Sequence, residues 1–189
     1  MKKGAMFGLD ARIALAIFGA LSVISGASLY SAIQNAKVTA TITELQELTK
    51  SLESYYLDTG SIPELHSTII YLAKSSYLVD NPSITGWKGP YSPLKTHLVS
   101  LQQANGNDVH IIYARDNLDW SSITATEACN SSNTCYSWSR IYDHKSIYTE
   151  AQKSAIDKKI DNSDGADKGN FRWDANSINL KGIIVPSLN

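Results

Sequence analysis

The N-terminal part of the chain changes its pattern of hydrophobic positions once, and that change predicts a long helix with two different surfaces. No charged residue occurs from Ile13 to Ile33, and about 20 apolar residues are enough to cross a bilayer as a helix. Lys2, Lys3 and Arg12 precede this run. Because basic residues stay on the cytoplasmic side of a membrane, the pattern places the N-terminus in the cytoplasm and the rest of the chain across the membrane.

After the apolar run, the hydrophobic positions follow helical spacing. They are separated by steps of three and four, as on one face of an α-helix, and they are Val38, Ile42, Leu45, Leu48, Leu52 and Tyr55. Asp58-Thr59-Gly60, with Pro63 just beyond, is a C-terminal stop signal, and no proline interrupts Leu9 to Thr59. We expect one continuous helix of roughly 45 residues, about 65–70 Å long.

Three interpretations of the apolar run are open at this point. It is a retained signal-anchor, a secretory signal cut near Ser25-Gly26-Ala27, or a helix behind a short leader that is cut between Gly8 and Leu9. A cleaved signal peptide has no reason to continue in phase into an amphipathic helix. The continuous pattern therefore favours a mature protein that keeps the whole helix.

Two motifs in this chain resemble those of type IV pilin-like proteins, most closely the major pseudopilin of the type II secretion system. LESYYLDTGSIP resembles the end of that family's long helix, and ITGWKGPYSP resembles its Trp-x-Gly-Pro-Tyr segment. The matching residues are Tyr55, Asp58, Gly60 and Pro63 in the first motif, and Trp87, Gly89, Pro90 and Tyr91 in the second. The separation of the motifs is also like the family's, and the resemblance covers approximately residues 1 to 115.

The resemblance implies a membrane-anchored subunit that works by assembly. In such proteins a leader is removed after a glycine, here between Gly8 and Leu9, and the apolar helix is held in the inner membrane before it packs in a filament core. Ile13, Phe18 and Leu21 are the residues that we expect in that core. The implied partners are other pseudopilins or pilins, the inner-membrane assembly machinery and membrane lipid.

The chain departs from the family at positions that matter for assembly. Leu9 stands where processed family members usually begin with Phe, and Ile13 stands where they carry Glu. That Glu neutralises the terminal amine of a neighbouring subunit, and a charge within the apolar run needs such a partner. Because minor or tip pseudopilins dispense with the Glu, we expect either a subunit of that kind or a diverged protein. Leu98 to Gly106 replaces the family's Asp-Pro-Trp-Gly segment, so the family's calcium loop is not transferred.

Together, the patterns and the resemblance predict an α+β, pilin-like fold, with the long helix packed on a small antiparallel sheet. We expect a leader at 1–8, a transmembrane and filament-core helix at 9–33, its amphipathic continuation at 34–58 and a periplasmic head at 59–189. The expected strands of the head are Val109–Arg115 with Leu98–Leu101 as its hairpin partner, Cys135–Tyr142, Phe171–Trp173 and Ile178–Val185. Its expected helices are Leu65–Leu78 and Ile147–Ile160.

Two features of the head suggest a disulfide and a calcium site. Cys129 and Cys135 are expected to form a disulfide, because the compartment inferred from the topology is oxidising. An acidic, glycine-containing loop holds Asp161, Asp164 and Asp167, whose carboxylates are hard oxygen ligands suited to calcium. The loop does not fit the EF-hand pattern, and a solvated turn without metal is the alternative interpretation.

The sequence contains no motif typical of an enzyme. The four histidines form no pair four residues apart, and neither a P-loop nor a Gly-x-Ser-x-Gly segment occurs. A net charge of −1 gives no electrostatic footprint for nucleic acid. We therefore expect a structural subunit of a secretion or pilus-like filament that acts in protein export. The rival hypothesis is a monomeric, signal-anchored or secreted periplasmic domain for binding or adhesion.

Overall fold

The computed structural model describes residues 6–116, 129 and 134–186. Within these residues, the helix α1 spans Met6–Thr59 and the helix α2 spans Glu150–Ile160, and a short 3₁₀ helix, η1, spans Ser75–Leu78. The chain divides into two compact units, Met1–Thr39 and Ala40–Asn189, and α1 contributes residues to both.

The first unit consists, where it is described, of the apolar part of α1. Ile13, Phe18 and Leu21 are all exposed in it. By length and composition, α1 from Asp10 onward can cross a membrane, with a mean hydropathy of 1.9 in its most apolar window. The predicted continuous helix is therefore confirmed, and it is longer at its N-terminus than the hydrophobic pattern required.

The end of α1 lies where the sequence placed it. The backbone N–H of Gly60 donates to the carbonyl of Tyr56 at 2.8 Å, and Gly60 has a φ of 69°. This left-handed conformation is the usual way to close a helix, and glycine adopts it without the steric cost that a Cβ brings. The stop signal was thus interpreted correctly.

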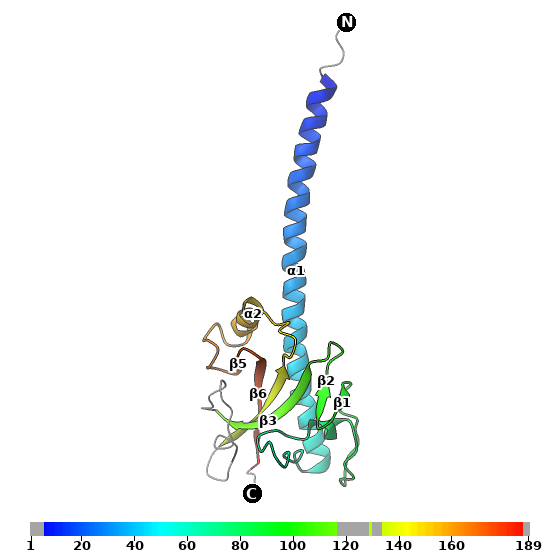
Figure 1. The fold of residues 1–189 in the computed structure, drawn as a ribbon, viewed down its shortest axis with the longest axis vertical. Coiled ribbons are helices and arrows are strands. Elements are labelled where there is room, and N and C mark those ends of the chain that lie inside the picture. Colours follow the sequence, from blue (N-terminus) through cyan, green and yellow to red (C-terminus); the bar gives the residue numbers. More distant parts are fainter. Residues whose placement is uncertain (1–5, 117–128, 130–133, 187–189) are drawn as a thin grey trace. The chain divides into compact units, whose positions relative to one another are not determined.

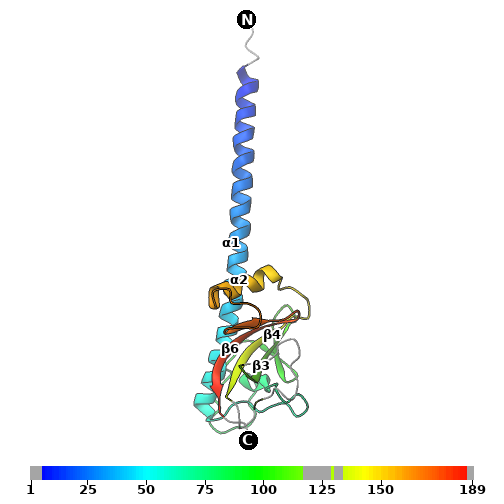
Figure 2. The same cartoon turned by 90° about the vertical axis from the view of Figure 1, so that its left-hand side faces the viewer.

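The second unit contains a six-stranded antiparallel sheet in the order β1-β2-β3-β4-β6-β5 (Figures 1 and 2). Its strands are β1 Lys95–His97, β2 Ser100–Gln102, β3 Asp108–Arg115, β4 Cys135–Tyr142, β5 Phe171–Trp173 and β6 Ser177–Val185. The strands β3, β4 and β6 form its centre, and α2 contacts β5. This arrangement confirms the α+β, pilin-like fold.

One face of the sheet is covered by residues 40–59 of α1. Thr49 lies at the contact, where its hydroxyl group is 2.9 Å from that of Ser139 on β4. Gly182 on β6 makes this approach possible, because a Cβ at that position would lie 3.1 Å from Cγ2 of Thr49. The predicted apolar face of the helix is buried here, as the low exposure of Leu45, Leu48, Leu52 and Tyr55 shows.

The other face of the sheet has its own small core. Leu72 packs there with Ile112 and Ala114 of β3 and Trp138 of β4. Because alternate residues of a strand point to opposite faces, Ile112 and Trp138, which pair across the two strands, lie on the same side. The sheet is therefore a middle layer with side chains packed on both faces.

The expected helix at Leu65–Leu78 was wrong. The segment instead pairs with β3 beyond the end of β2: Ala73 N–H donates to Ile111 at 2.9 Å, and Tyr113 N–H donates to Tyr71 at 2.9 Å. Only the 3₁₀ helix η1 at its end is helical. The hydrogen bonds that complete the edge of β3 outweighed the helical spacing of the apolar residues, which alone cannot distinguish the two outcomes.

The other predicted elements are confirmed: β4 and β5 have the expected bounds, and the others have shifted ends. The strand opposite β3 begins at Ser100, not Leu98, and α2 begins at Glu150, not Ile147. Thr149 caps α2 in a reciprocal capping box with Gln152. The carboxylate of Asp143 accepts the backbone N–H groups of residues 147 and 148, so these residues have a partner outside a helix.

We predict that Leu48→Ala lowers the free energy of unfolding by about 2–5 kcal/mol, because it leaves a cavity between helix and sheet. Leu48 is 3% exposed, whereas Leu57, on the same helix, is 81% exposed. Leu57→Ala is therefore the matched control and should change stability by less than about 0.5 kcal/mol. The measurement is urea denaturation of a soluble chain that begins at residue 34, and equal effects of the two variants would contradict the packing.

Candidate functional site

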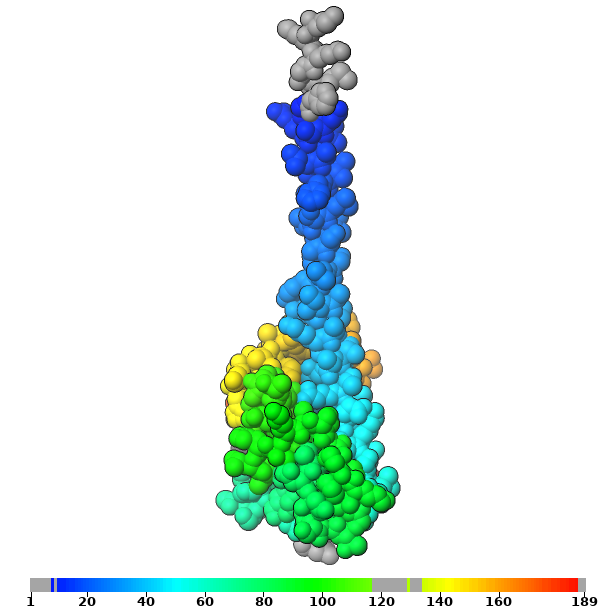
Figure 3. Space-filling view, turned by 90° about the vertical axis from the view of Figure 1, so that its right-hand side faces the viewer, coloured from blue at the N-terminus to red at the C-terminus, as the bar shows by residue number. Residues whose placement is uncertain are grey.

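The two motifs of the sequence meet at the C-terminal end of α1. Figure 3 shows the segment that follows the helix, coloured teal to green, lying against the cyan last turns of α1. The hydroxyl of Ser51 on α1 donates to the carbonyl of Tyr91 at 2.8 Å, and the backbone N–H of Tyr91 donates to Leu78 at 2.7 Å. The second motif is thus held between the helix and η1.

Asp58 makes the central polar contact between the motifs. Its Oδ1 lies 2.9 Å from Nζ of Lys88, and its Oδ2 accepts the hydroxyl of Tyr91 at 3.0 Å. The same hydroxyl accepts the backbone N–H of Lys88 at 2.8 Å. The hydrogen bond from Lys88 holds the pKa of Asp58 below its usual value, and the bond from Tyr91 acts in the same direction.

Aromatic rings complete the contact. Tyr91 lies edge-on to both Tyr55 and Trp87, with ring centroids 5.8 Å and 5.7 Å apart, a favourable geometry for aromatic pairs. Trp87 Nε1 also donates to the carbonyl of Tyr77 at 3.0 Å. A Cβ at Gly89 would lie 2.6 Å from the Trp87 ring and 2.8 Å from the Tyr91 ring, so the glycine of the motif is what lets the two rings approach.

The remaining motif residues lie nearby. Gly60 ends α1, and the carbonyl of Pro63 accepts the hydroxyl of buried Tyr113 at 3.1 Å. Pro90 follows Gly89 through a cis peptide bond. We name the set of Tyr55, Asp58, Trp87, Lys88 and Tyr91 the helix-end clasp. Its hydrogen bonds and ring contacts hold the second motif against the end of α1.

Two residues of this region were not recognised from the sequence. Lys88 is the cation that pairs with Asp58, and its place inside the second motif was an available signal, since a carboxylate at a helix end needs a partner. Gly86 has a φ of 90°, and a Cβ there would overlap the carbonyl oxygen of Asp58. Only the packed structure shows that this glycine is needed for close approach.

The disulfide between Cys129 and Cys135 is present, with a Cα–Cα distance of 5.6 Å. Cys135 is the first residue of β4 and is buried. The predicted cross-link is confirmed, and it ties Cys129 to the first residue of β4.

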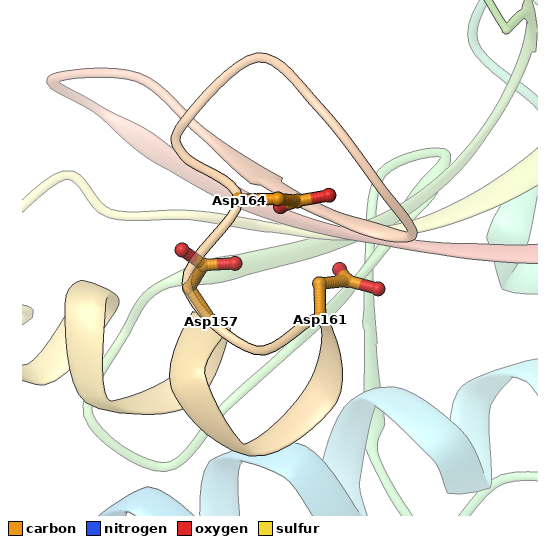
Figure 4. Close-up of side chains that lie close together, drawn as sticks. All are labelled: Asp157, Asp161 and Asp164. Carbon is orange, nitrogen blue, oxygen red and sulfur yellow. The ribbon is translucent and has the colours of Figure 1, made fainter.

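Carboxylates of the acidic loop do gather, but in a set different from the expected one. Asp157, Asp161 and Asp164 come from the end of α2 and the loop after it (Figure 4), and their nearest oxygens lie within 4.8 Å of one another. Asp167, which the sequence also suggested, is not in this group. Asp157 was missed, although its spacing of four residues from Asp161 places both on one side of a helix.

The three carboxylates differ in how their oxygens are used. Asp161 is occupied by the chain, because its Oδ2 accepts the backbone N–H groups of Asn170 and Phe171 at 2.9 and 2.6 Å. Asp157 is only 3% exposed, and its Oδ2 accepts the N–H of Gly165 at 3.2 Å. Its buried Oδ1 has no hydrogen-bond partner among the described residues. Burial raises the pKa of Asp157, and the negative charges of the other two carboxylates raise it further.

The site residues of the apolar helix lie in the first unit. Gly8 and Leu9, the expected cleavage site, are within α1, and residues 1–5 of the expected leader are outside the described residues. The side chains of Ile13, Phe18 and Leu21 are exposed in the described structure.

These features define a pilin-like protein, with a long N-terminal helix that is apolar at first and then packs on an antiparallel sheet. A family model, that of protein G of the type II secretion system (T2SS), matches residues 28–104. The matched range contains both motifs of the clasp, and the match supports a pseudopilin-like protein. Comparison with curated proteins and with solved structures gave no match.

We predict that Asp58→Asn lowers the free energy of unfolding at pH 7, and that the difference from the unchanged protein shrinks in acid. The pKa of Asp58 is lowered in the fold, so its stabilising effect is present above the unfolded value of about 3.9 and is lost as pH falls through the folded value. Urea denaturation at several pH values measures this. Asp80→Asn, at an exposed position, is the control, and a loss that stays constant down to pH ~3 would contradict an ionic role.

Proposed function

We propose that this protein is a structural subunit of a type II secretion or type IV pilus-like filament and acts in protein export by assembly. The family match over residues 28–104 supports a pseudopilin role in general. The observation that carries the proposal further is the exposed apolar surface of α1 that precedes and overlaps the start of this match. A helix that is apolar on every side needs lipid or other helices around it.

We propose that the helix occupies two environments, one after the other. In the first, residues 9–33 cross the inner membrane, with Lys2, Lys3 and Arg12 on the cytoplasmic side and the head in the periplasm. In the second, the same surface leaves the lipid and packs against the helices of other pseudopilins. Removal of a leader after Gly8 precedes this transfer in the proposed pathway.

Ile13 determines what kind of subunit we propose. A filament subunit with Glu at this position neutralises the terminal amine of its neighbour, and Ile13 has no charge with which to do so. Burying an uncompensated ammonium group among apolar helices is costly. A subunit at the tip, or one used in few copies, avoids this cost because it does not have to repeat the contact along the filament.

The filament assignment is tested by expressing the protein with the export machinery but without the major subunit. We expect no long filaments by electron microscopy, and we expect filaments to return with this protein incorporated when the major subunit is added. The mass of the mature chain is measured in the same cells, with a start at Leu9 expected, and Gly8→Arg as the uncut control. A mature chain that starts near Ser28 would favour the secreted-domain alternative, and long filaments of this protein alone would contradict the tip role.

A second proposed property is calcium binding by Asp157, Asp161 and Asp164. The buried, unpartnered Oδ1 of Asp157 favours it, because an ionised oxygen without a partner is costly to bury and a cation would compensate it. Calcium prefers carboxylate and carbonyl oxygens in flexible loops. Bound there, it would join the end of α2 to the loop that leads to β5.

For calcium, we predict that the ion raises the melting temperature of the protein relative to EDTA, and that Asp157→Asn abolishes the increase. At a concentration 100 times the Kd, one bound ion adds about 2.7 kcal/mol of stability. Asp167→Asn removes a charge of the same loop outside the cluster and should keep the increase. In EDTA, Asp157→Asn should be more stable than the unchanged protein, since it relieves the repulsion; an unaltered calcium effect in this variant would rule out the site.

A further inference from the structure

A cavity of about 290 Å³ lies on the face of the sheet opposite α1. Its floor is formed by paired residues of β3 and β4, above all His110 and Arg140, which are directly opposite each other. Its walls come from Tyr71 and Leu72 in the segment that completes the edge of β3, and from Tyr142 at the end of β4. The cavity belongs wholly to the second unit and shares no residue with the clasp or the acidic loop.

Arg140 is the residue of the cavity whose bonding is incomplete. Its side chain is only 13% exposed, yet the nearest carboxylate among the described residues, that of Asp174, is 3.9 Å away. Its Nε is buried and has no hydrogen-bond partner within the part of the chain that the structure describes. The guanidinium group also lies over the ring of Tyr142, with Cζ 5.3 Å from the ring centroid, and this contact holds its plane in place.

Three other polar residues of the cavity, Asp108, His110 and His144, already have hydrogen-bond partners. Asp108 is the carboxylate that lines it, and its Oδ1 and Oδ2 contact ring nitrogens of His97 and His144 at 2.9 and 2.8 Å. Nδ1 of His110 lies 2.9 Å from the hydroxyl of Ser100. Burial, with the nearby charge of Arg140, lowers the pKa of His110 to about 4, so this ring is neutral at neutral pH and does not repel the guanidinium.

We propose that this cavity binds a carboxylate carried on a flat apolar group, with Arg140 as the residue that recognises the carboxylate. A guanidinium group presents parallel N–H donors that match a carboxylate, and it is favoured over lysine where such pairs are buried. The aromatic and aliphatic walls, formed by Tyr71, Leu72, Ile112 and Tyr142, suit an apolar body. The volume restricts the ligand to a small molecule or to one terminal residue of a peptide.

A metal ion fits this cavity less well, although histidines surround it. Among the described residues, the group of three or more His, Cys, Asp or Glu ligands close enough to hold a metal is the cluster of Asp157, Asp161 and Asp164. Arg140 at the floor also opposes a cation. Because the guanidinium group of Arg140 has few hydrogen-bond acceptors around it, it favours a ligand that supplies acceptor oxygens.

The test uses the full chain in detergent micelles and ligand-observed saturation-transfer NMR, with empty micelles as the blank. Benzoate is the probe, and benzamide has the same shape without the charge. We expect benzoate to bind and benzamide to bind about tenfold more weakly or not at all, because hydrogen bonds to a charged group are the stronger ones. Acetyl-Gly-Phe with a free carboxylate distinguishes the source: tighter binding than benzoate identifies a peptide terminus, and weaker binding identifies a small acid.

Arg140→Lys keeps the charge but removes the parallel donors, and Arg140→Gln removes both. We expect each to weaken benzoate binding about tenfold or more. Lys145→Gln, next to His144 in the chain and exposed, removes one positive charge outside the cavity and should leave binding unchanged. If Arg140→Gln does not fold, Arg140→Lys still decides the question. Equal binding of benzoate and benzamide, unchanged binding in Arg140→Lys, or no binding of either carboxylate would overturn the proposal.

Discussion

The contact between residues 40–59 of α1 and the sheet is the constraint on which the second unit depends. Leu45, Leu52 and Tyr55 are almost fully buried, and Thr49 reaches the hydroxyl of Ser139 over Gly182, where no side chain intervenes. Close packing of this kind leaves few alternative positions for the helix, because interiors resist even small changes of volume. Since the clasp holds the end of the same helix, residues 40–59 of α1 are held within the second unit at two places.

The same helix explains why the protein needs partners. Its first part has the composition of a membrane span, and its large apolar side chains are exposed. Exposed apolar surface is stable in lipid or against other helices, but not in water. The helix is thus a single element with two different surfaces: residues 40–59 pack on the sheet on one side, whereas the large apolar side chains of the first part are exposed among the described residues.

The two polar clusters of the head differ in sign and in what they lack. Around Asp157, negative charges gather beside an oxygen without a donor; at Arg140, a buried positive group has too few acceptors. Asp161, by contrast, has a structural role, since its carboxylate accepts hydrogen bonds from the backbone of the loop. Unsatisfied buried groups are rare in folded proteins, and we propose that a ligand supplies the missing partner at each of these two places.

The sequence by itself determined the long helix, its change of surface, its end at Gly60 and most strands of the sheet, because these follow from periodic local patterns and stop residues. It also indicated the disulfide and the residues of the clasp other than Lys88. Only the tertiary structure decided that Leu65–Leu78 completes the edge of β3, that Asp157 joins the acidic cluster in place of Asp167, and that His110 and Arg140 form the floor of a cavity. The sheet edge and the cavity depend on strand pairing and on contacts between residues far apart in the chain, which local spacing does not show. The acidic cluster depends on how the loop after α2 folds back onto the end of that helix.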